Sequence, residues 1–234
     1  MTDTSEALTD AIRLIARFDG DLVEIVVLSL QVSLTAVAAA ALIGMPLGAA
    51  LALFRFPGRH SVIVLVNAFM GLPPVVVGLV VYLLLSRAGP FGTLGLLFTP
   101  TAMIVAQTIL VLPIVAALTR QTVEDLWREY EEQLRSLGAG PARAVRTLLW
   151  DGRFSLMTAV LAGFGRASAE VGAVMIVGGN IDHATRVMTT TIALEVSKGD
   201  LALALALGLL LIVLSTAING AAYLVREVVA RRHG

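Results

Sequence analysis

The chain of 234 residues contains no cysteine and a single lysine, Lys198. Without cysteine it has no disulfides, no thiolate metal site and no cysteine nucleophile. Lys198 lies outside any Gly-x-x-x-x-Gly-Lys-Ser/Thr pattern, so a Walker-type nucleotide site is excluded. The three histidines, His60, His183 and His233, are far apart in the sequence and give no metal-ligand spacing. We therefore expect no catalytic residue, no cofactor and no metal on this chain, and we do not expect an enzyme.

Charge is also scarce. Charged residues make up 15% of the chain and apolar residues 57%, against about a quarter and about a half in ordinary soluble domains. This composition excludes a soluble protein and places the chain among integral membrane proteins. The net charge of zero indicates no particular partner, and we expect no nucleic acid.

Five apolar stretches have the length of about twenty residues that a helix needs to cross a bilayer core of about 30 Å. They cover residues 22–54, 61–86, 99–119, 154–178 and 201–225. We predict an all-α membrane protein with five transmembrane helices in one transmembrane domain, residues 22–234. Gly44 and Gly48 have the spacing that lets membrane helices approach closely, and packing within the chain is favoured over a dimer seam.

The first residues, 1–21, lack the basic region and long apolar core of a signal peptide. Leu8, Ile12, Ile15 and Phe18 instead predict a short helix on the outer face. With an odd number of spans, the two termini lie on opposite sides. If residues 120–153 are cytoplasmic, eleven arginines lie inside and five basic residues outside, which places the N-terminus outside and the C-terminus in the cytoplasm.

Residues 120–153 form a polar segment between two apolar stretches. Leu126, Tyr130, Leu134 and Leu137 recur at helical spacing and predict an apolar stripe on one helix. Gly138 fits a left-handed cap at the end of that helix, and Pro141 fits the first turn of the next. A membrane protein gains little from holding an amphipathic hairpin in water unless the hairpin docks on something, so this segment predicts a binding surface for a soluble partner.

The same segment resembles the coupling loop of ABC importer permeases, whose pattern is Glu-Ala-Ala, three residues, Gly, nine residues, Ile-x-Leu-Pro. Glu132 and Gly138 match, Gln133 and Leu134 replace the alanines, and Leu148 is all that corresponds to the tail. Residues 163–200, GFGRASAEVGAVMIVGGNIDHATRVMTTTIALEVSKGD, are similar to the oxyanion branch and within it to the tungstate importer permeases.

The resemblance implies a type I ABC importer permease in the inner membrane of a prokaryote. It implies a homodimer that works with a cytoplasmic ATP-binding subunit, where ATP is hydrolysed, and an extracytoplasmic oxyanion-binding protein. Tungstate is the first substrate to expect and molybdate the second, with sulfate a further alternative. The coupling residues implied are Tyr130, Glu132, Gln133, Leu134, Leu137, Gly138 and Pro141.

Arg166 and Glu170 are ionisable residues within a predicted span, where such groups usually pair or line a cavity. Four residues apart, they would share a helical face. They form either a structural ion pair or part of a gate for an anion. Asn180 and Arg186 belong to a hydroxyl-rich segment that follows, which is either a solvated loop or a docking surface and outer gate.

Two other classes of function stay open. A secondary anion transporter would use Glu170 as a proton relay, although the internal repeats common in such proteins are not evident. A membrane anchor for a cytoplasmic complex would explain the polar segment without transport.

Overall fold

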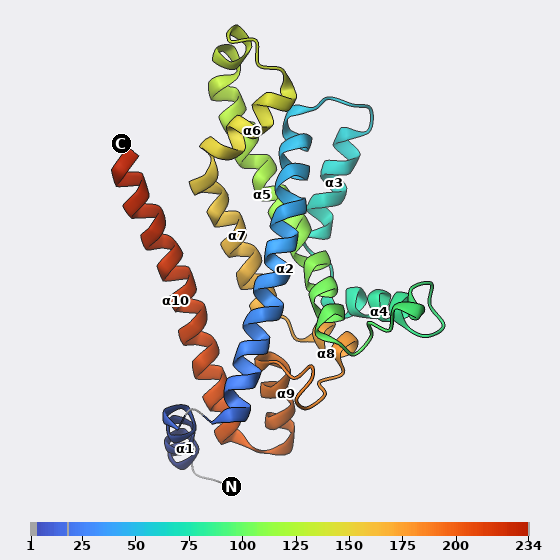
Figure 1. Cartoon of the computed structure of the whole chain (residues 1–234), viewed down its shortest axis with the longest axis vertical. Coiled ribbons are helices and arrows are strands. Elements are labelled where there is room, and N and C mark those ends of the chain that lie inside the picture. The colour runs from blue at the N-terminus through green and yellow to red at the C-terminus, as the bar shows by residue number, and fades with distance from the viewer. Residues whose placement is uncertain (1–3, 18, 234) are drawn as a thin grey trace. The chain divides into compact units, whose positions relative to one another are not determined.

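The computed structural model describes residues 4–17 and 19–233, and in these residues every regular element is a helix (Figure 1). The prediction of an all-α fold is therefore confirmed for this part of the chain. The elements are α1 (Thr4–Ala16), α2 (Gly20–Leu53), α3 (Arg59–Phe69), α4 (Pro74–Leu85), the short 3₁₀ helix η1 (Gly92–Leu94), α5 (Pro100–Ser136), α6 (Pro141–Asp151), α7 (Arg153–Ser168), α8 (Gly172–Gly178), α9 (Met188–Lys198) and α10 (Leu201–His233).

Within the described residues, three helices are long and apolar enough to cross a membrane, namely α2, α5 and α10. Two further pairs, α3 with α4 and α7 with α8, meet the same criteria together but bend at a short break. The number of spans rises to five if each bent pair crosses once. The five predicted stretches thus correspond to these helices and pairs, and the count of five stays a prediction.

Proline breaks one of the predicted spans and not the others. Between α3 and α4 the chain runs through Pro73, which has extended backbone angles, and Pro74 then occupies the first turn of α4. A proline has no N–H to donate and disfavours helix in the residue before it, so the first helix stops here. Pro46 in α2 and Pro113 in α5 lie inside helices that continue through them.

The chain divides into two compact units. The first comprises residues 1–35, 73–107 and 168–220, and the second comprises residues 36–72, 108–167 and 221–234. Helices α2, α5 and α10 contribute residues to both units.

In the second unit α2 lies directly against α5. A Cβ on Gly48 would collide with the carbonyl oxygen of Ala116, and one on Gly44 would lie 3.2 Å from the carbonyl oxygen of Leu112 and from Val115. Only glycine permits so close an approach of two backbones. The two glycines pack against their own chain, as the sequence favoured.

The first unit contains a core in which α1, α2, α9 and α10 meet. Its buried residues are Ala11, Leu22, Ile25, Met188, Ala206 and Leu207, and Ile15 packs against them. The predicted helix at the N-terminus is present as α1, with Leu8 and Ile12 exposed; Phe18 lies outside the described residues. In the same unit α4 packs on α8, where Gly78 lies close to Ala173.

Candidate functional site

The turn between α5 and α6 closes with the hydrogen bonds of a Schellman motif. The N–H of Ala139 donates to the carbonyl oxygen of Leu134 at 2.9 Å, and the N–H of Gly138 donates to that of Arg135 at 3.0 Å. Gly138 has a φ of 70°, and α6 begins at Pro141. The left-handed cap and the helix restart predicted from the sequence are both confirmed.

Most of the predicted apolar stripe packs inside the chain. Leu126, Tyr130 and Leu134 pack on a cluster of four buried residues that α2, α5 and α6 contribute: Ala49, Val123, Ala144 and Leu148. Leu137, in contrast, is 81% exposed. The stripe therefore holds the α5–α6 hairpin (residues 120–153) on the end of α2.

The outer surface of the hairpin is polar with isolated apolar side chains. Glu132, Gln133, Gly138 and Pro141 are exposed, as the coupling pattern expects. Trp150 is 72% exposed, and its ring lies beneath the guanidinium of Arg153 at 4.9 Å. An open depression of about 750 Å³ borders this surface, lined by Pro46, Val145, Arg146, Thr147, Leu149 and Trp150. Trp150 was not among the coupling residues predicted from the sequence, although it lies on the exposed side of an amphipathic helix.

An ion-pair network lies at the base of the hairpin. Glu124 of α5 accepts from Arg59 of α3 at 2.7 Å and from Arg120 of α5 at 2.6 Å. The spacing of Arg120 and Glu124, one helical turn apart, could have indicated their pairing. Nothing in the sequence connects Arg59, 65 positions earlier, with this carboxylate.

The prediction that Arg166 and Glu170 share a helical face is wrong. Helix α7 ends at Ser168, so Glu170 lies in the break before α8. Glu170 is 3% exposed, and its Oε1 accepts the backbone N–H of Ala173 in the first turn of α8 at 3.0 Å. A side-chain acceptor here takes the place of a carbonyl from a continuing helix, which is why the chain can leave the helix at this point. Arg166, in the last turn of α7, is partly exposed.

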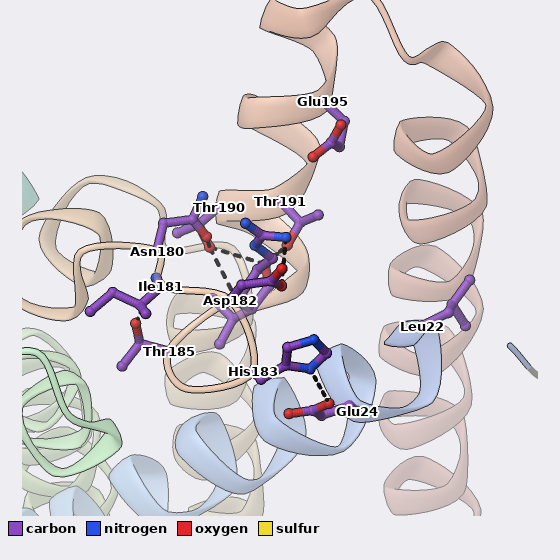
Figure 2. Close-up of polar contacts among 12 residues, drawn as sticks. Leu22, Glu24, Asn180, Ile181, Asp182, His183, Thr185, Thr190, Thr191 and Glu195 are labelled. Carbon is purple, nitrogen blue, oxygen red and sulfur yellow. Dashed lines mark hydrogen bonds and ion pairs between the residues drawn. The ribbon is translucent and has the colours of Figure 1, made fainter. Parts of the chain in front are cut away.

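The hydroxyl-rich segment after α8 has buried, hydrogen-bonded threonines, whereas residues 181–184 of its loop are exposed (Figure 2). The Thr190 hydroxyl donates to Oδ1 of Asn180 at 2.8 Å, and the Thr185 hydroxyl donates to the carbonyl oxygen of Gly178 at 2.6 Å while accepting the N–H of Ile181. Thr185, Thr190 and Thr191 are buried. These bonds fix the loop of residues 179–187, in which Asn180 and His183 have positive φ. The default expectation of a solvated loop is therefore wrong for its threonines.

Charged side chains surround a pocket of about 240 Å³ beside this loop. Nδ1 of His183 lies 2.9 Å from Oε2 of Glu24 (Figure 2). Arg186 pairs with Asp182 at 2.7 Å. The hydrogen bond to Glu24, followed by the charges of Asp182 and Glu24, raises the pKa of His183 above its usual value. Because Asp182 compensates its charge, Arg186 is a weaker candidate for an anion site than the sequence suggested.

One group of side chains in the described residues has the composition of a metal site. The ligand atoms of Asp21, Glu24 and His183 lie within 4.8 Å of one another. This group could not be predicted from the sequence, because α2 and the loop after α8 supply it together. All three side chains are exposed, and the ion pair of His183 with Glu24 accounts for their proximity without a metal.

Comparisons with known proteins cover most of the chain. Residues 44–231 match the family described as binding-protein-dependent transport system inner membrane component. The tungstate uptake system permease protein of Peptoclostridium acidaminophilum is 42% identical over 95% of this chain and 98% of its own length. A protein of Haloferax volcanii named probable anion ABC transporter permease protein is 39% identical over 91% of this chain and 94% of its own length. The tungstate uptake system permease protein of Campylobacter jejuni is 41% identical over 71% of this chain and 70% of its own length.

Proposed function

The chain belongs to the family of inner membrane components of binding-protein-dependent transport systems, and we propose that it is the permease subunit of an ATP-driven importer of a tetrahedral oxyanion. The resemblance to ABC importer permeases drawn from residues 120–153 and 163–200 is confirmed. The observation that carries the proposal is the similarity to a tungstate uptake permease over nearly the whole length of both chains.

Tungstate is the first substrate that we propose, because two of the three relatives named above are tungstate uptake permeases. Molybdate is a tetrahedral dianion of nearly equal size, so it is the closest competitor, and sulfate is a third. The site that discriminates among them belongs on the extracytoplasmic binding protein, which delivers the anion to this chain. The permease itself therefore need not encode the choice.

The α5–α6 hairpin is the proposed contact for the cytoplasmic ATPase. Exposed Glu132 and Gln133, the tight turn at Gly138 and the protruding Leu137 support this assignment. Tyr130 and Leu134 support it indirectly, because they pack the hairpin against the chain's own core. ATP-driven movement of the partner would then be passed to the membrane helices through α5.

The rival transport mechanism has less support. A secondary transporter would need Glu170 to take up and release protons. In this structure the Glu170 carboxylate accepts a backbone N–H of α8 and is almost fully buried, which is the arrangement of a structural cap. A pathway role for Arg166, Glu170, Asn180 and Arg186 stays a proposal of lower rank than the coupling role of the hairpin.

Reconstitution tests the function directly. The permease, with its ATPase and binding protein in liposomes, should accumulate tungstate only when ATP and binding protein are both present. Titration of the binding protein with tungstate, molybdate and sulfate gives the order of preference. Uptake driven by a proton gradient without ATP would favour the secondary transporter, and stable binding of the ATPase without any uptake would favour the membrane anchor.

A further inference from the structure

Arg59 links the end of one helix to the start of the next. It is the first residue of α3, and Gly58 before it has a φ of 85°, which turns the chain back toward α2. Its Nε donates to the carbonyl oxygen of Leu51 at 2.6 Å, and its Nη2 donates to that of Ala52 at 3.3 Å. These carbonyls belong to the last turn of α2, which lacks helical partners and where the helix dipole favours a cation.

The same guanidinium also reaches α5. Its Nη2 donates to Oε1 of Glu124, whose Oε2 accepts from Nη1 of Arg120. The exposed fractions of the side chains are 30% for Arg59, 23% for Glu124 and 14% for Arg120, so the network is largely withdrawn from water. One carboxylate is therefore shared between an arginine of another helix and an arginine of its own helix.

Glu124 lies where the α5–α6 hairpin joins the rest of the second unit. Its neighbour Val123 packs with Ala49 of α2 and with Ala144 and Leu148 of α6. Helix α5 runs without interruption from this point to Ser136. A continuous helix transmits displacement along its axis, so a movement of the hairpin arrives at Glu124 and, through Arg59, at the ends of α2 and α3.

We propose that Arg59 is a positioning residue for energy coupling. It locks the ends of α2 and α3 to α5, so that these helices follow when the ATPase moves the hairpin. This inference rests on the proposed function, because it takes the hairpin as the contact for the ATPase. Arg120 contacts the same carboxylate from within α5 and transmits nothing between helices.

Two variants form a matched pair. Arg59→Gln and Arg120→Gln each leave Glu124 with one arginine, so neither strands the carboxylate without a counter-ion. Only Arg59→Gln breaks the connection between helices. Arg59→Lys keeps the charge, but one ammonium group cannot reproduce the planar fork that bonds two carbonyls and a carboxylate together.

The first measurement is oxyanion uptake per ATP hydrolysed in liposomes that contain the ATPase and the binding protein. Arg59→Gln removes the guanidinium that bonds Leu51, Ala52 and Glu124. It should lower this ratio by roughly tenfold or more, because the loss of even one charge-assisted hydrogen bond corresponds to about that factor, while ATPase binding is retained. Arg120→Gln should stay near the unaltered protein, and Arg59→Lys should lie between. Equal losses in the two glutamine variants would reduce the network to local stability and overturn the proposal.

A distance measurement tests the connection of α3 to α5 through Arg59 without relying on transport. The chain has no cysteine, so Ser61→Cys in α3 and Ser136→Cys in α5, both exposed, give two unique sites for spin labels. Arg59→Gln should broaden the distance distribution between the labels, and Arg120→Gln should not. An unchanged distribution in Arg59→Gln overturns the inference. A broadened distribution, combined with no uptake by the unaltered protein, would refute the proposed function but would still support the role of Arg59 in holding α2 and α3 to α5.

Discussion

Individual polar side chains in the first unit mainly form hydrogen bonds within the chain. The threonines around Asn180 bond to the loop's own backbone and amide groups, Glu170 caps α8, and His183 joins the loop to Glu24. Of these residues, Glu170 and Asn180 were candidates for a gate or pathway from the sequence, because polar groups in a membrane are costly unless they function or pair. In the structure their partners lie within the chain, which favours structural roles for most of them.

The pair of His183 and Glu24 predicts a pH dependence. Because the pKa of His183 is raised, the stabilisation from this pair is complete below the unfolded value of about 6.5 and is lost as the pH rises through the higher folded value. Glu24→Gln should bring the pKa of His183 back down toward the ordinary value. Histidine NMR titration of the variant against the unaltered protein measures this; an unchanged titration of His183 would contradict the assignment.

Glu170 allows the structural and proton-relay roles to be separated. Glu170→Gln keeps an oxygen that can accept the N–H of Ala173 but cannot ionise, whereas Glu170→Ala removes the cap and should cost about 1 kcal/mol of stability. ATP-driven uptake should therefore survive better in the glutamine variant than in the alanine variant. Complete loss of uptake in Glu170→Gln, with normal thermal stability, would restore the relay hypothesis.

Pairs of helices are held by backbone features that side chains cannot replace. The α5–α6 turn depends on one left-handed residue, and the approach of α2 to α5 depends on two positions without a Cβ. These features position the hairpin on the membrane helices. Each feature can be tested by mutation, because another glycine of the chain, in open space or in a helix, serves as its control.

Gly138 and Gly140 differ in backbone angle and not in available space. A Cβ at either position would meet nothing within 4 Å, but Gly138 has a φ of 70° and Gly140 one of −71°. Gly138→Val should therefore distort the turn and impair ATPase binding, at a cost of about 1–2 kcal/mol or more, and Gly140→Val should be tolerated. Co-purification of the ATPase and uptake assays measure this. Equal ATPase binding and uptake in the two variants would contradict the role of backbone conformation at Gly138.

The contact of α2 with α5 predicts a second difference between glycines. Gly48→Ala places a Cβ against the Ala116 carbonyl and should destabilise the protein by about 1–3 kcal/mol. Gly208→Ala lies in α10, where a Cβ would meet nothing within 4 Å, and should gain up to about 1 kcal/mol in helix propensity. Thermal unfolding in detergent compares the two. A Gly48→Ala protein as stable as the unaltered one would show that the helices can separate at little cost.

The whole molecule carries its charge asymmetrically. Most arginines lie in segments on the hairpin's side of the predicted spans, and the described residues hold three to five spans. If five spans cross the membrane, the positive-inside rule predicts that the hairpin and the C-terminus lie in the cytoplasm. In the proposed assembly, a homodimer of this chain contacts the ATPase on the cytoplasmic side and the binding protein on the extracytoplasmic side.

Reporter fusions test this topology. A reporter fused after Gly234 should report a cytoplasmic location. A reporter fused at the N-terminus should report an extracytoplasmic location, because an odd number of spans separates the two ends. Single cysteines introduced at Ser136 and Ala184 into this cysteine-free chain should label from opposite sides of the membrane. Labelling of both from one side, or two termini on one side, would remove the five-span arrangement.

Much of the fold was determined by the sequence alone. Long apolar stretches must be helical in a bilayer to satisfy their backbone groups, so the helical fold and the hairpin at Gly138 and Pro141 follow from local chemistry. The break between α3 and α4 was not predicted, because residues 61–86 read as one continuous apolar stretch. The coupling pattern and residues 163–200 also indicated the family before any fold was known.

Only the tertiary structure decided which polar groups meet. Arg59 and Glu124, or Glu24 and His183, are 65 and 159 positions apart, and no local pattern encodes such pairs. The end of α7 at Ser168 was also not predicted, because the apolar stretch of residues 154–178 continues through Glu170, whose carboxylate accepts the N–H of Ala173 in α8. Helix formation is a property of neighbouring residues, whereas the pairing of charges depends on how distant helices pack, and that packing is what separates the structural residues from those free to serve transport.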